Sequence, residues 1–393
     1  MTPSARVQAA IELLDQIIDA ARSKGAPADR VISEYFRQRR YAGSKDRRAV
    51  RELVYSAIRL CGPIPSSGRS AMLAAAEVDP SLAQLFDGSN HGPAPIEPGE
   101  EPARTGFGPD WLQAKLAASG IAGDEAAALL ERAPLDIRVN ALKADRETIE
   151  LPERGETLLS PQGLRFPSGL PIDQWAAYRD GEIEVQDLGS QLICEAMSVN
   201  PGDIVIDLCA GAGGKTLALA ARAGNAATLI AADTDKRRLG NLAPRARRAG
   251  ALVDRTILLD PGRELEALAD YAERADHVLV DAPCSGSGTW RRNPEGRWRL
   301  DQKELQRLVS LQDHVLDVAS KLVRPGGTLT YVTCSLLDDE GSERIDAFLA
   351  RNPGWEASNA ALGCGQPRGK GVRLTPFRDG TDGFFVAILR SSC

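Results

Sequence analysis

The sequence is poor in the residues that build several common catalytic and structural sites. Its 393 residues include three histidines and seven cysteines, and no two cysteines form a Cys-x-x-Cys pair. An odd number of scattered cysteines argues against a disulfide framework or a zinc site, so we expect no bound metal and a reducing, cytoplasmic location. Of the histidines, only His277 lies near a motif, so a histidine-based catalytic triad is not expected.

Long apolar segments are missing as well. No run of about 18 uninterrupted apolar residues occurs, so we predict no transmembrane helix and no membrane partner. The first residues lack a charged segment followed by an apolar run, so no secretory signal is expected. Hydrophobic residues make up 43% of the chain and charged residues 26%, which is typical of a soluble globular protein. The length suggests two or three domains.

Positive charge is not in excess overall, but it is unevenly distributed. The formal net charge is −6, which does not by itself indicate a nucleic-acid-binding protein. Residues 1–69 hold 13 basic and 7 acidic residues, whereas residues 70–131 hold 2 basic and 10 acidic residues. The N-terminal excess indicates either a basic binding face or an ordinary solvated helix surface, and charge alone leaves both open.

The first third of the chain has helical periodicity. Residues 5–60 carry apolar side chains at helical spacing, and two further helices are expected at 110–119 and 123–132. Residues 88–109 are rich in glycine, proline and acids, which predicts a loop or linker. We therefore predict an all-α domain over residues 1–132.

The remaining chain changes to strand periodicity. Residues 133–200 predict a small mixed α/β connecting subdomain that begins with a strand at 135–143, and residues 201–393 alternate strands with helices. This order predicts a mostly parallel, doubly wound sheet, with the last strand at or near its edge. The predicted strands are 204–208, 228–233, 256–259, 277–281, 327–333 and 384–389, and the helices between them include 213–222, 236–249 and 301–323.

A glycine-rich loop, Asp207-Leu-Cys-Ala-Gly-Ala-Gly-Gly-Lys-Thr216, joins the first of these strands to a helix. Asp233 ends the next strand, at a spacing that suits a carboxylate binding ribose hydroxyls. A phosphate-binding P-loop would need glycine where Cys209 stands, and a dinucleotide-binding turn would need a final glycine that is missing. A third interpretation, a site for S-adenosylmethionine, fits the pattern, because that ligand has no pyrophosphate to neutralise.

Two cysteines follow neighbouring strands of the predicted sheet. Cys284 lies after strand 277–281 and Cys334 lies directly after strand 327–333. Ligands of open α/β sheets bind beyond the carboxyl ends of the strands, so these two thiols are candidates for chemistry. A free cysteine is otherwise most often a small buried apolar residue. We assign that packing role to Cys61, Cys194, Cys209, Cys364 and Cys393.

Over residues 135–390 the sequence resembles the RsmB/Nop2/Sun family of RNA cytosine-5 methyltransferases. The resemblance implies a class I, Rossmann-like methyltransferase domain that uses S-adenosylmethionine and acts on RNA. Residues 1–132 are similar in helix pattern and basic charge to the NusB-like RNA-binding domain of RsmB-type members. The motifs that match are Arg138-Val-Asn-Ala-Leu-Lys143, Val185-Gln-Asp-Leu-Gly-Ser-Gln191, the loop 207–216, Asp281–Gly288, Arg291-Arg-Asn-Pro-Glu295, Pro325-Gly-Gly327, Tyr331-Val-Thr-Cys-Ser335 and Asp382-Gly-Phe-Phe385.

The resemblance implies a role for each site residue. Cys334 is the family's nucleophile, Cys284 assists release of the product, and Asp281 is the candidate for stabilising charge on the base. The implied substrate is RNA, with ribosomal RNA expected and transfer RNA as the alternative, and we expect a monomer. The implied cofactor contacts are Cys209, Ala210, Gly211, Ala212, Gly213, Gly214, Lys215, Asp233, Arg238, Asp260 and Asp281.

Several alternatives and departures accompany this interpretation. In DNA cytosine methyltransferases the Pro-Cys cysteine attacks instead, so Cys284 as nucleophile and DNA as substrate stay open, as does a non-catalytic RNA-binding or assembly protein. The family commonly has Glu-Asn-Glu where this chain has Glu340-Gly-Ser342, and Ala-Ala-Pro-Gly-Gly where it has Ala-Gly-Ala-Gly-Gly. Basic residues within 236–248 and 291–307 fit RNA backbone contact, and Trp290 and Trp298 are candidates for base stacking.

Overall fold

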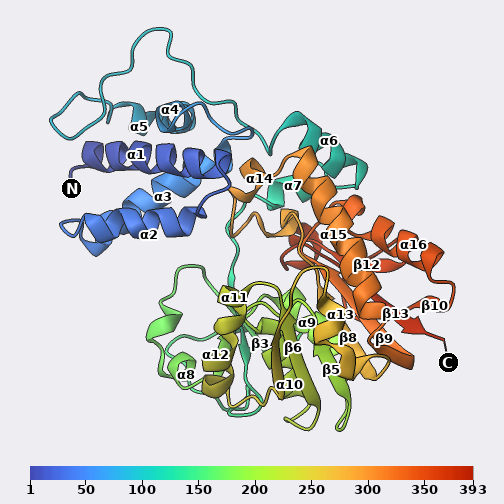
Figure 1. Cartoon of the computed structure of the whole chain (residues 1–393). Coiled ribbons are helices and arrows are strands. Elements are labelled where there is room, and N and C mark those ends of the chain that lie inside the picture. The colour runs from blue at the N-terminus through green and yellow to red at the C-terminus, as the bar shows by residue number, and fades with distance from the viewer. Residues whose placement is uncertain (393) are drawn as a thin grey trace. The chain divides into compact units, whose positions relative to one another are not determined.

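The computed structural model describes residues 1–392 and divides into two compact units (Figure 1). The first unit contains residues 1–131 together with 289–301, and the second contains residues 132–288 and the chain from 302 onward. No helix within the described residues is long and apolar enough to cross a membrane. Cys393, predicted to be a packing residue, lies outside the described residues.

The first unit is helical, as the periodicity predicted. Its longest helix, α1, packs against both α3 and α4 through an apolar face that includes the fully buried Leu14 and Ile17. The Thr2 side chain accepts a hydrogen bond from the Ala5 N–H and so caps the first turn of α1. The helices are α1 (Pro3–Arg22), α2 (Ala28–Gln38), α3 (Ser44–Leu60), α4 (Gly68–Val78), α5 (Pro80–Ala83), α6 (Asp110–Ala118), α7 (Asp124–Ala128) and α14 (Gly296–Arg299).

The segment 289–301 belongs to this helical unit, although the sequence analysis placed it in the domain over 201–393. Its short helix α14, orange in Figure 1, lies against α1. The prediction that Trp290 and Trp298 are available for base stacking is wrong, because their exposed fractions are 1% and 7%. Trp298 joins the apolar core of the helices and donates from Nε1 to the Cys61 carbonyl at 3.3 Å.

Two arginines of the same segment cap the ends of long helices. Arg297 is fully buried and donates to the carbonyls of Arg59 at 3.1 Å and Cys61 at 2.8 Å, at the end of α3. Arg299 donates to the carbonyls that follow α1, at Gly25 and Ala26. A guanidinium there satisfies carbonyls that lack a helical partner and complements the negative end of the helix dipole. These charges therefore hold the helical unit together, which corrects their assignment to RNA contact.

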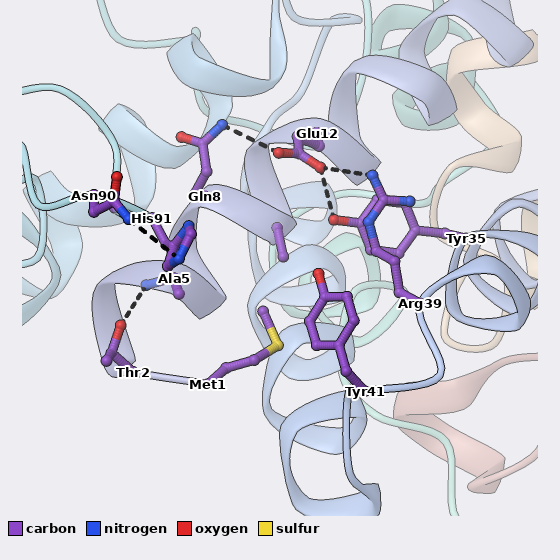
Figure 2. A pocket seen from close by; sticks show the side chains of 12 residues that line it. Met1, Thr2, Ala5, Gln8, Glu12, Tyr35, Arg39, Tyr41, Asn90 and His91 are labelled. Atoms are coloured by element: carbon purple, nitrogen blue, oxygen red, sulfur yellow. Dashed lines mark hydrogen bonds and ion pairs between the residues drawn. The ribbon is translucent and has the colours of Figure 1, made fainter.

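A cavity of about 1080 Å³ opens between α1, α2 and residues 90–92 of the same unit (Figure 2). In its wall the Glu12 carboxylate accepts from the Tyr35 hydroxyl at 2.8 Å and from Arg39 Nη2 at 3.1 Å. The Arg39 guanidinium also lies over the Tyr35 ring, 3.7 Å from its centroid. The charged groups in this wall therefore pair with one another and join α1 to the end of α2.

The second unit begins with a small antiparallel sheet. Its strands, in order, are β2 (Glu156–Thr157), β3 (Gly163–Phe166), β1 (Leu135–Val139) and β4 (Ile183–Val185). The turn η1 (Ile172–Gln174) and helix α8 (Ala176–Arg179) follow β3. Phe166 and Trp175 meet edge to face with centroids 5.4 Å apart, within a core that also contains Ile137 and Ile183.

A larger sheet of nine strands forms the rest of this unit and is doubly wound, as predicted. β7, β6, β5, β8 and β9 are parallel neighbours, and β13 runs antiparallel beside β9. In order the strands are β11 (Gln366–Arg368), β12 (Gly371–Leu374), β13 (Phe384–Ser391), β9 (Val323–Thr333), β8 (Ala275–Asp281), β5 (Ile204–Asp207), β6 (Thr228–Asp233) and β7 (Arg255–Leu258), and β10 (Trp355–Ser358) also pairs with β13.

Two details refine the sequence analysis. The last strand, β13, lies near the edge of the sheet rather than at it, because the β11–β12 hairpin continues the sheet beyond it. The helix predicted at 236–249 is divided at Asn241 into α11 and α12. The helices of this unit are α9 (Leu188–Ala196), α10 (Gly214–Arg222), α11 (Lys236–Gly240), α12 (Leu242–Ala249), α13 (Glu264–Ala267), α15 (Gln302–Ser320), α16 (Ser342–Arg351) and α17 (Pro376–Asp379), with 3-10 turns η2 (Ala269–Tyr271), η3 (Ser287–Thr289) and η4 (Asp338–Glu340).

The large sheet is covered by a separate apolar core on each face. Val205 packs into the core that contains residues of α9, α10 and α12, whereas its neighbour Ile206 packs into the core with α15 and α16. Successive side chains of a strand point to opposite faces, so a strand buried on both faces reads as a continuous apolar run. Because the strands are parallel, Asp207, Asp233, Asp281 and Thr333 all end strands at the same edge of the sheet.

Candidate active site

The glycine-rich loop lies at this edge, between β5 and α10. Gly211 and Gly213 have φ values of +55° and +83°, a backbone conformation that side-chain-bearing residues rarely adopt. A Cβ atom on Gly211 would lie 2.6 Å from the Arg238 guanidinium, and one on Gly213 would lie 2.9 Å from Leu242. The glycines are therefore needed for the turn itself and for its close approach to α11 and α12.

Asp233 supports the loop from the end of β6. Its buried carboxylate accepts from the N–H groups of Gly211 and Asp235, each at 2.7 Å. Arg238 is exposed, and its guanidinium lies beside Gly211. Asp260 is exposed two residues beyond β7, where its backbone carbonyl accepts from the Arg263 N–H at 2.9 Å. The structure thus gathers Asp233 and Arg238 around the loop, and it shows no bond from Asp260 to it within the described residues.

Asp207, the first residue of the loop motif, is a buried carboxyl with an incomplete set of partners. Its Oδ2 atom accepts from the Thr216 hydroxyl at 2.6 Å, whereas its Oδ1 atom is buried without a hydrogen-bond partner in the described chain. Burial raises the pKa of this carboxyl to about 7, and the nearby Asp281 and Asp233 add to the increase. An unsatisfied buried oxygen of this kind suits a cationic or hydrogen-bond-donating ligand.

Lys215 and Asp281 form an ion pair at the same strand ends. The Lys215 Nζ atom lies 2.7 Å from Asp281 Oδ2, and the lysine side chain is 9% exposed. Burial alone would lower the pKa of Lys215, but the Asp281 carboxylate outweighs it and raises that pKa above its ordinary value. The Lys215 ammonium also lies 5.7 Å from the centroid of the Phe384 ring, in the Asp382-Gly-Phe-Phe385 motif.

The two predicted cysteines meet beyond β8 and β9. The Sγ atoms of Cys284 and Cys334 are 3.3 Å apart, and both side chains are partly buried. The hydrogen bond with Cys334, followed by burial, raises the pKa of the Cys284 thiol well above its usual value. Cys284 therefore stays protonated near neutral pH, and either sulfur can be the donor in this pair.

The backbones that carry the thiols are also joined directly. The Gly288 N–H donates to the Cys334 carbonyl at 3.0 Å, and the Gly383 N–H donates to the Gly288 carbonyl at 2.8 Å. A Cβ atom on Gly288 would lie 2.1 Å from the Gly383 carbonyl oxygen, so only glycine fits. This close packing explains the glycines in two of the motifs that the sequence analysis singled out.

Other motif residues, not predicted as site residues, support the loop from behind. Arg138 is buried and donates from Nε to Gln186 Oε1 at 2.7 Å, and Gln186 Nε2 in turn donates to the Gly214 carbonyl at 3.4 Å. Arg245 donates to the Ala212 carbonyl at 2.8 Å. The signal for these residues was their presence in the Arg138–Lys143 and Val185–Gln191 motifs and in the basic run over 236–248.

The basic run over 236–248 is partly used within the fold. Arg245 and Arg248 both pair with Glu184, whose side chain is 3% exposed. Lys236, Arg237 and Arg247 are exposed. This segment is thus only in part a free basic surface, because Arg245 and Arg248 are used in ion pairs within the fold rather than for RNA contact.

The remaining cysteines lie as packing residues would. Cys61 and Cys194 are buried, and burial raises their pKa values to about 11 and about 12. Cys364 is half-buried against the core beside α9 and α10, and Cys209 is partly buried in the loop, where burial raises its pKa well above the usual value. Within residues 1–392 no cluster of three or more His, Cys, Asp or Glu side chains could hold a metal ion.

Comparison with known proteins agrees with this geometry. Residues 195–390 match the family model described as 16S rRNA methyltransferase RsmB/F. Ribosomal RNA small subunit methyltransferase B of Xylella fastidiosa strain Temecula1 is 35% identical over 291 residues, which are 72% of this chain and 66% of that protein. The same protein of strain 9a5c is 35% identical over 72% of this chain and 68% of its own length. The match therefore spans about two thirds of these curated relatives.

A solved structure extends the similarity to the whole chain. The crystal structure of PH0851 has a TM-score of 0.71 and 25% sequence identity, and the match covers 99% of each chain. The matched family segment contains the glycine-rich loop, Asp281 and both strand-end cysteines, and it confirms the resemblance on which the site was predicted. The chain belongs to the RsmB/F family of 16S rRNA methyltransferases.

Proposed function

We propose that this protein transfers a methyl group from S-adenosylmethionine to carbon 5 of a cytosine in ribosomal RNA. The observation that carries the proposal is the 3.3 Å separation of the Cys284 and Cys334 sulfurs, beside the Lys215–Asp281 ion pair and the glycine-rich loop. Cytosine C5 is a poor nucleophile until a thiolate adds to C6, and a second thiol is useful when that bond has to break. Two thiols in contact therefore fit cytosine C5 chemistry better than methylation of an oxygen or an exocyclic nitrogen.

The residues of the loop fit the proposed cofactor. S-adenosylmethionine carries a sulfonium and an ammonium, and the loop is bordered by three carboxyl groups, of which Asp207 has an unpartnered buried oxygen. The glycines leave the loop backbone free of side chains. When bound, the cofactor supplies an activated methyl group. The residues proposed to hold it are Cys209, Ala210, Gly211, Ala212, Gly213, Gly214, Lys215, Asp233, Arg238, Asp260 and Asp281.

The proposed reaction begins with Cys334. Its thiolate adds to C6 and forms an S–C6 bond, and the electron pair of the C5–C6 double bond becomes available at C5. C5 would take the methyl group that the cofactor supplies, with the electron pair of the broken methyl–sulfur bond left on the cofactor sulfur, and the Asp281 carboxylate, held by Lys215, would stabilise positive charge at ring N3 and N4. A base then takes the C5 proton, the S–C6 bond breaks, and its electrons return to the Cys334 sulfur. Cys284 assists this last step.

The division of labour between the thiols rests on the family motifs that contain them, Asp281–Gly288 for Cys284 and Tyr331-Val-Thr-Cys-Ser335 for Cys334. Attack needs a thiolate, and the raised pKa of Cys284 keeps that residue a thiol. The Cys284 sulfur lies 3.3 Å from the Cys334 sulfur, close enough for Cys284 to assist release of the product. The family motif and the raised pKa of Cys284 both favour Cys334 as the nucleophile over the alternative in which Cys284 attacks.

Ribosomal RNA is the proposed acceptor because the curated relatives carry that substrate in their names. The test is to incubate the protein and methyl-labelled S-adenosylmethionine with 16S rRNA, transfer RNA or DNA, and to digest each product to nucleosides. Label in 5-methylcytidine from 16S rRNA supports the proposal. Label found only in transfer RNA or only in DNA would assign that nucleic acid as the substrate instead. Binding of RNA without methyl transfer would indicate a non-catalytic RNA-binding or assembly protein. The monomeric state and the cytoplasmic location stay predictions, and sedimentation velocity would test the former.

A further inference from the structure

We propose that Glu340 is a positioning residue that sets the spacing of the two thiols, an inference that rests on the proposed function for its catalytic meaning. Glu340 ends the short turn η4 and is completely buried. A buried carboxylate is costly unless several donors surround it. Its donors therefore show what the carboxylate does in the fold.

These donors come from both cysteine loops at once. Glu340 Oε1 accepts from the Ser285 N–H at 2.8 Å, and Glu340 Oε2 accepts from the Ser285 hydroxyl and, at 2.6 Å, from the Ser335 hydroxyl. Ser285 directly follows Cys284, and Ser335 directly follows Cys334. One carboxylate thus binds the residue after each thiol, from segments 55 and 5 residues away in the sequence.

Further bonds make this connection rigid. Gln312 on α15 donates from Nε2 to Glu340 Oε1 at 3.0 Å and to the Pro283 carbonyl at 2.9 Å, so the helix binds the carboxylate and the residue before Cys284. The Ser287 and Ser335 hydroxyls are 3.1 Å apart, and the Leu336 N–H donates to Ser287 at 2.9 Å. The network reaches both loops but bonds neither sulfur, so Glu340 acts through the loops.

Spacing matters because both thiols have to reach one base. A displacement of about 1 Å in a catalytic group can reduce a rate about 100-fold. Truncation at Glu340 leaves the Ser285 N–H and two hydroxyls without this acceptor, so fewer bonds join the loops and their spacing is expected to increase. Glu340→Gln keeps the shape and one carbonyl acceptor, so it is expected to retain much of the spacing.

The test measures thiol spacing without relying on methylation. Diamide oxidises two neighbouring thiols to a disulfide, and its azo group takes up the two protons and two electrons as a hydrazine. The Cys284–Cys334 bridge is quantified by peptide mass spectrometry for wild type, Glu340→Ala, Glu340→Gln and Ser335→Ala, all checked for folding by circular dichroism. Glu343→Gln is the matched control, because that carboxylate is 58% exposed and lies 3.9 Å from Arg344.

We expect wild type and Glu343→Gln to form the bridge at the same rate, Glu340→Ala at least about tenfold more slowly, and Glu340→Gln in between. Ser335→Ala removes one of the hydrogen-bond donors to Glu340 and is expected to slow formation of the disulfide several-fold. If Glu340→Ala does not fold, Ser335→Ala serves as the test variant in its place. The proposal would be overturned if folded Glu340→Ala, or Ser335→Ala in its place, formed the disulfide at the wild-type rate. It would also be overturned if the wild-type protein formed no Cys284–Cys334 disulfide. Slowed oxidation in a protein that methylates no RNA would uphold the positioning role and reject the proposed function.

Discussion

Cys284 and Cys334 are 50 residues apart in the sequence, and their sulfur atoms lie 3.3 Å apart in the fold. The contact follows from the pairing of two parallel strands, in which Asp281 of β8 lies opposite Val332 of β9. Each cysteine comes within three residues of such a strand end, on loops that are bonded to each other through Gly288 and Cys334. The chemistry proposed for this site depends on that contact.

The first prediction concerns the pH dependence of cofactor binding. Because the pKa of Asp207 is raised to about 7, mainly by burial, its carboxyl is neutral in the folded chain at pH 6 and charged at pH 8. The charged form attracts a sulfonium and an ammonium, so the Kd for S-adenosylmethionine is expected to fall as the pH rises through 7. Isothermal titration calorimetry between pH 6 and 8 measures this. Asp207→Asn should bind more weakly at pH 8 and show a much flatter profile.

The same carboxyl gives the opposite trend in stability without cofactor. Its folded pKa lies above the ordinary value of 3.8, so its contribution is fully present below that value and is lost as the pH rises to about 7. The free energy of unfolding should therefore lose this contribution between about pH 4 and 7 and show no further change from Asp207 above that. A wild type and an Asp207→Asn variant with parallel stability profiles in urea would contradict the burial argument.

The second prediction concerns Gly288. Gly288→Ala is expected to lower the free energy of unfolding by about 1–3 kcal/mol and to reduce methylation, because the new Cβ atom meets the Gly383 backbone, which cannot move aside cheaply. Gly240→Ala is the control, since no heavy atom lies within 4 Å of its Cβ position in helix α11. Denaturant melts of both variants measure the difference. Equal stability of the two would mean that the loops tolerate separation at Gly288.

The third prediction tests whether Arg297 stabilises the helical unit or contacts RNA. Removing its buried guanidinium leaves carbonyls at the end of α3 without a donor, so Arg297→Ala is expected to destabilise the protein by about 3 kcal/mol. Arg307→Ala, which breaks an exposed pair with Glu304, should cost about 0.5 kcal/mol or less. Urea unfolding measures both.

If Arg297 instead contacted RNA, the same variant would give a different result. An RNA phosphate contact would leave stability unchanged and would reduce the slope of log Kd against log salt concentration by about one. That outcome in filter-binding experiments would restore the RNA-contact interpretation of this segment.

Much of the fold and of the candidate site could be predicted, because their signals are local. Short apolar runs such as 204–206 predict buried strands. Parallel strands bring the residues at and after their ends to one edge of the sheet, so Cys284, Cys334 and Asp281 could be named together. The glycine-rich loop could be predicted as well. The positive φ values of Gly211 and Gly213 require glycine, so the turn is visible in the sequence. The roles of these residues depended on the family resemblance.

What could not be predicted depends on distant partners. Arg297 and Trp298 lie in a polar, basic stretch, and only contacts with Ile58 and Cys61, more than 230 residues earlier in the sequence, show that they are buried. The partners of Glu340 lie 55, 28 and 5 residues away, so its role has no periodic signal. The β11–β12 hairpin was missed because its strands have only three and four residues, too few to show an alternating pattern.

The proposed attack of Cys334 on cytosine is tested most directly by trapping the covalent intermediate. Cys284→Ala is incubated with 16S rRNA and S-adenosylmethionine, denatured and digested, and the peptide joined to cytidine is sequenced by mass spectrometry. We predict a cytidine adduct on Cys334 in this variant, and neither an adduct nor 5-methylcytidine with Cys334→Ala. An adduct on Cys284 in the Cys334→Ala protein, or 5-methylcytidine formed by that protein, would contradict the assignment.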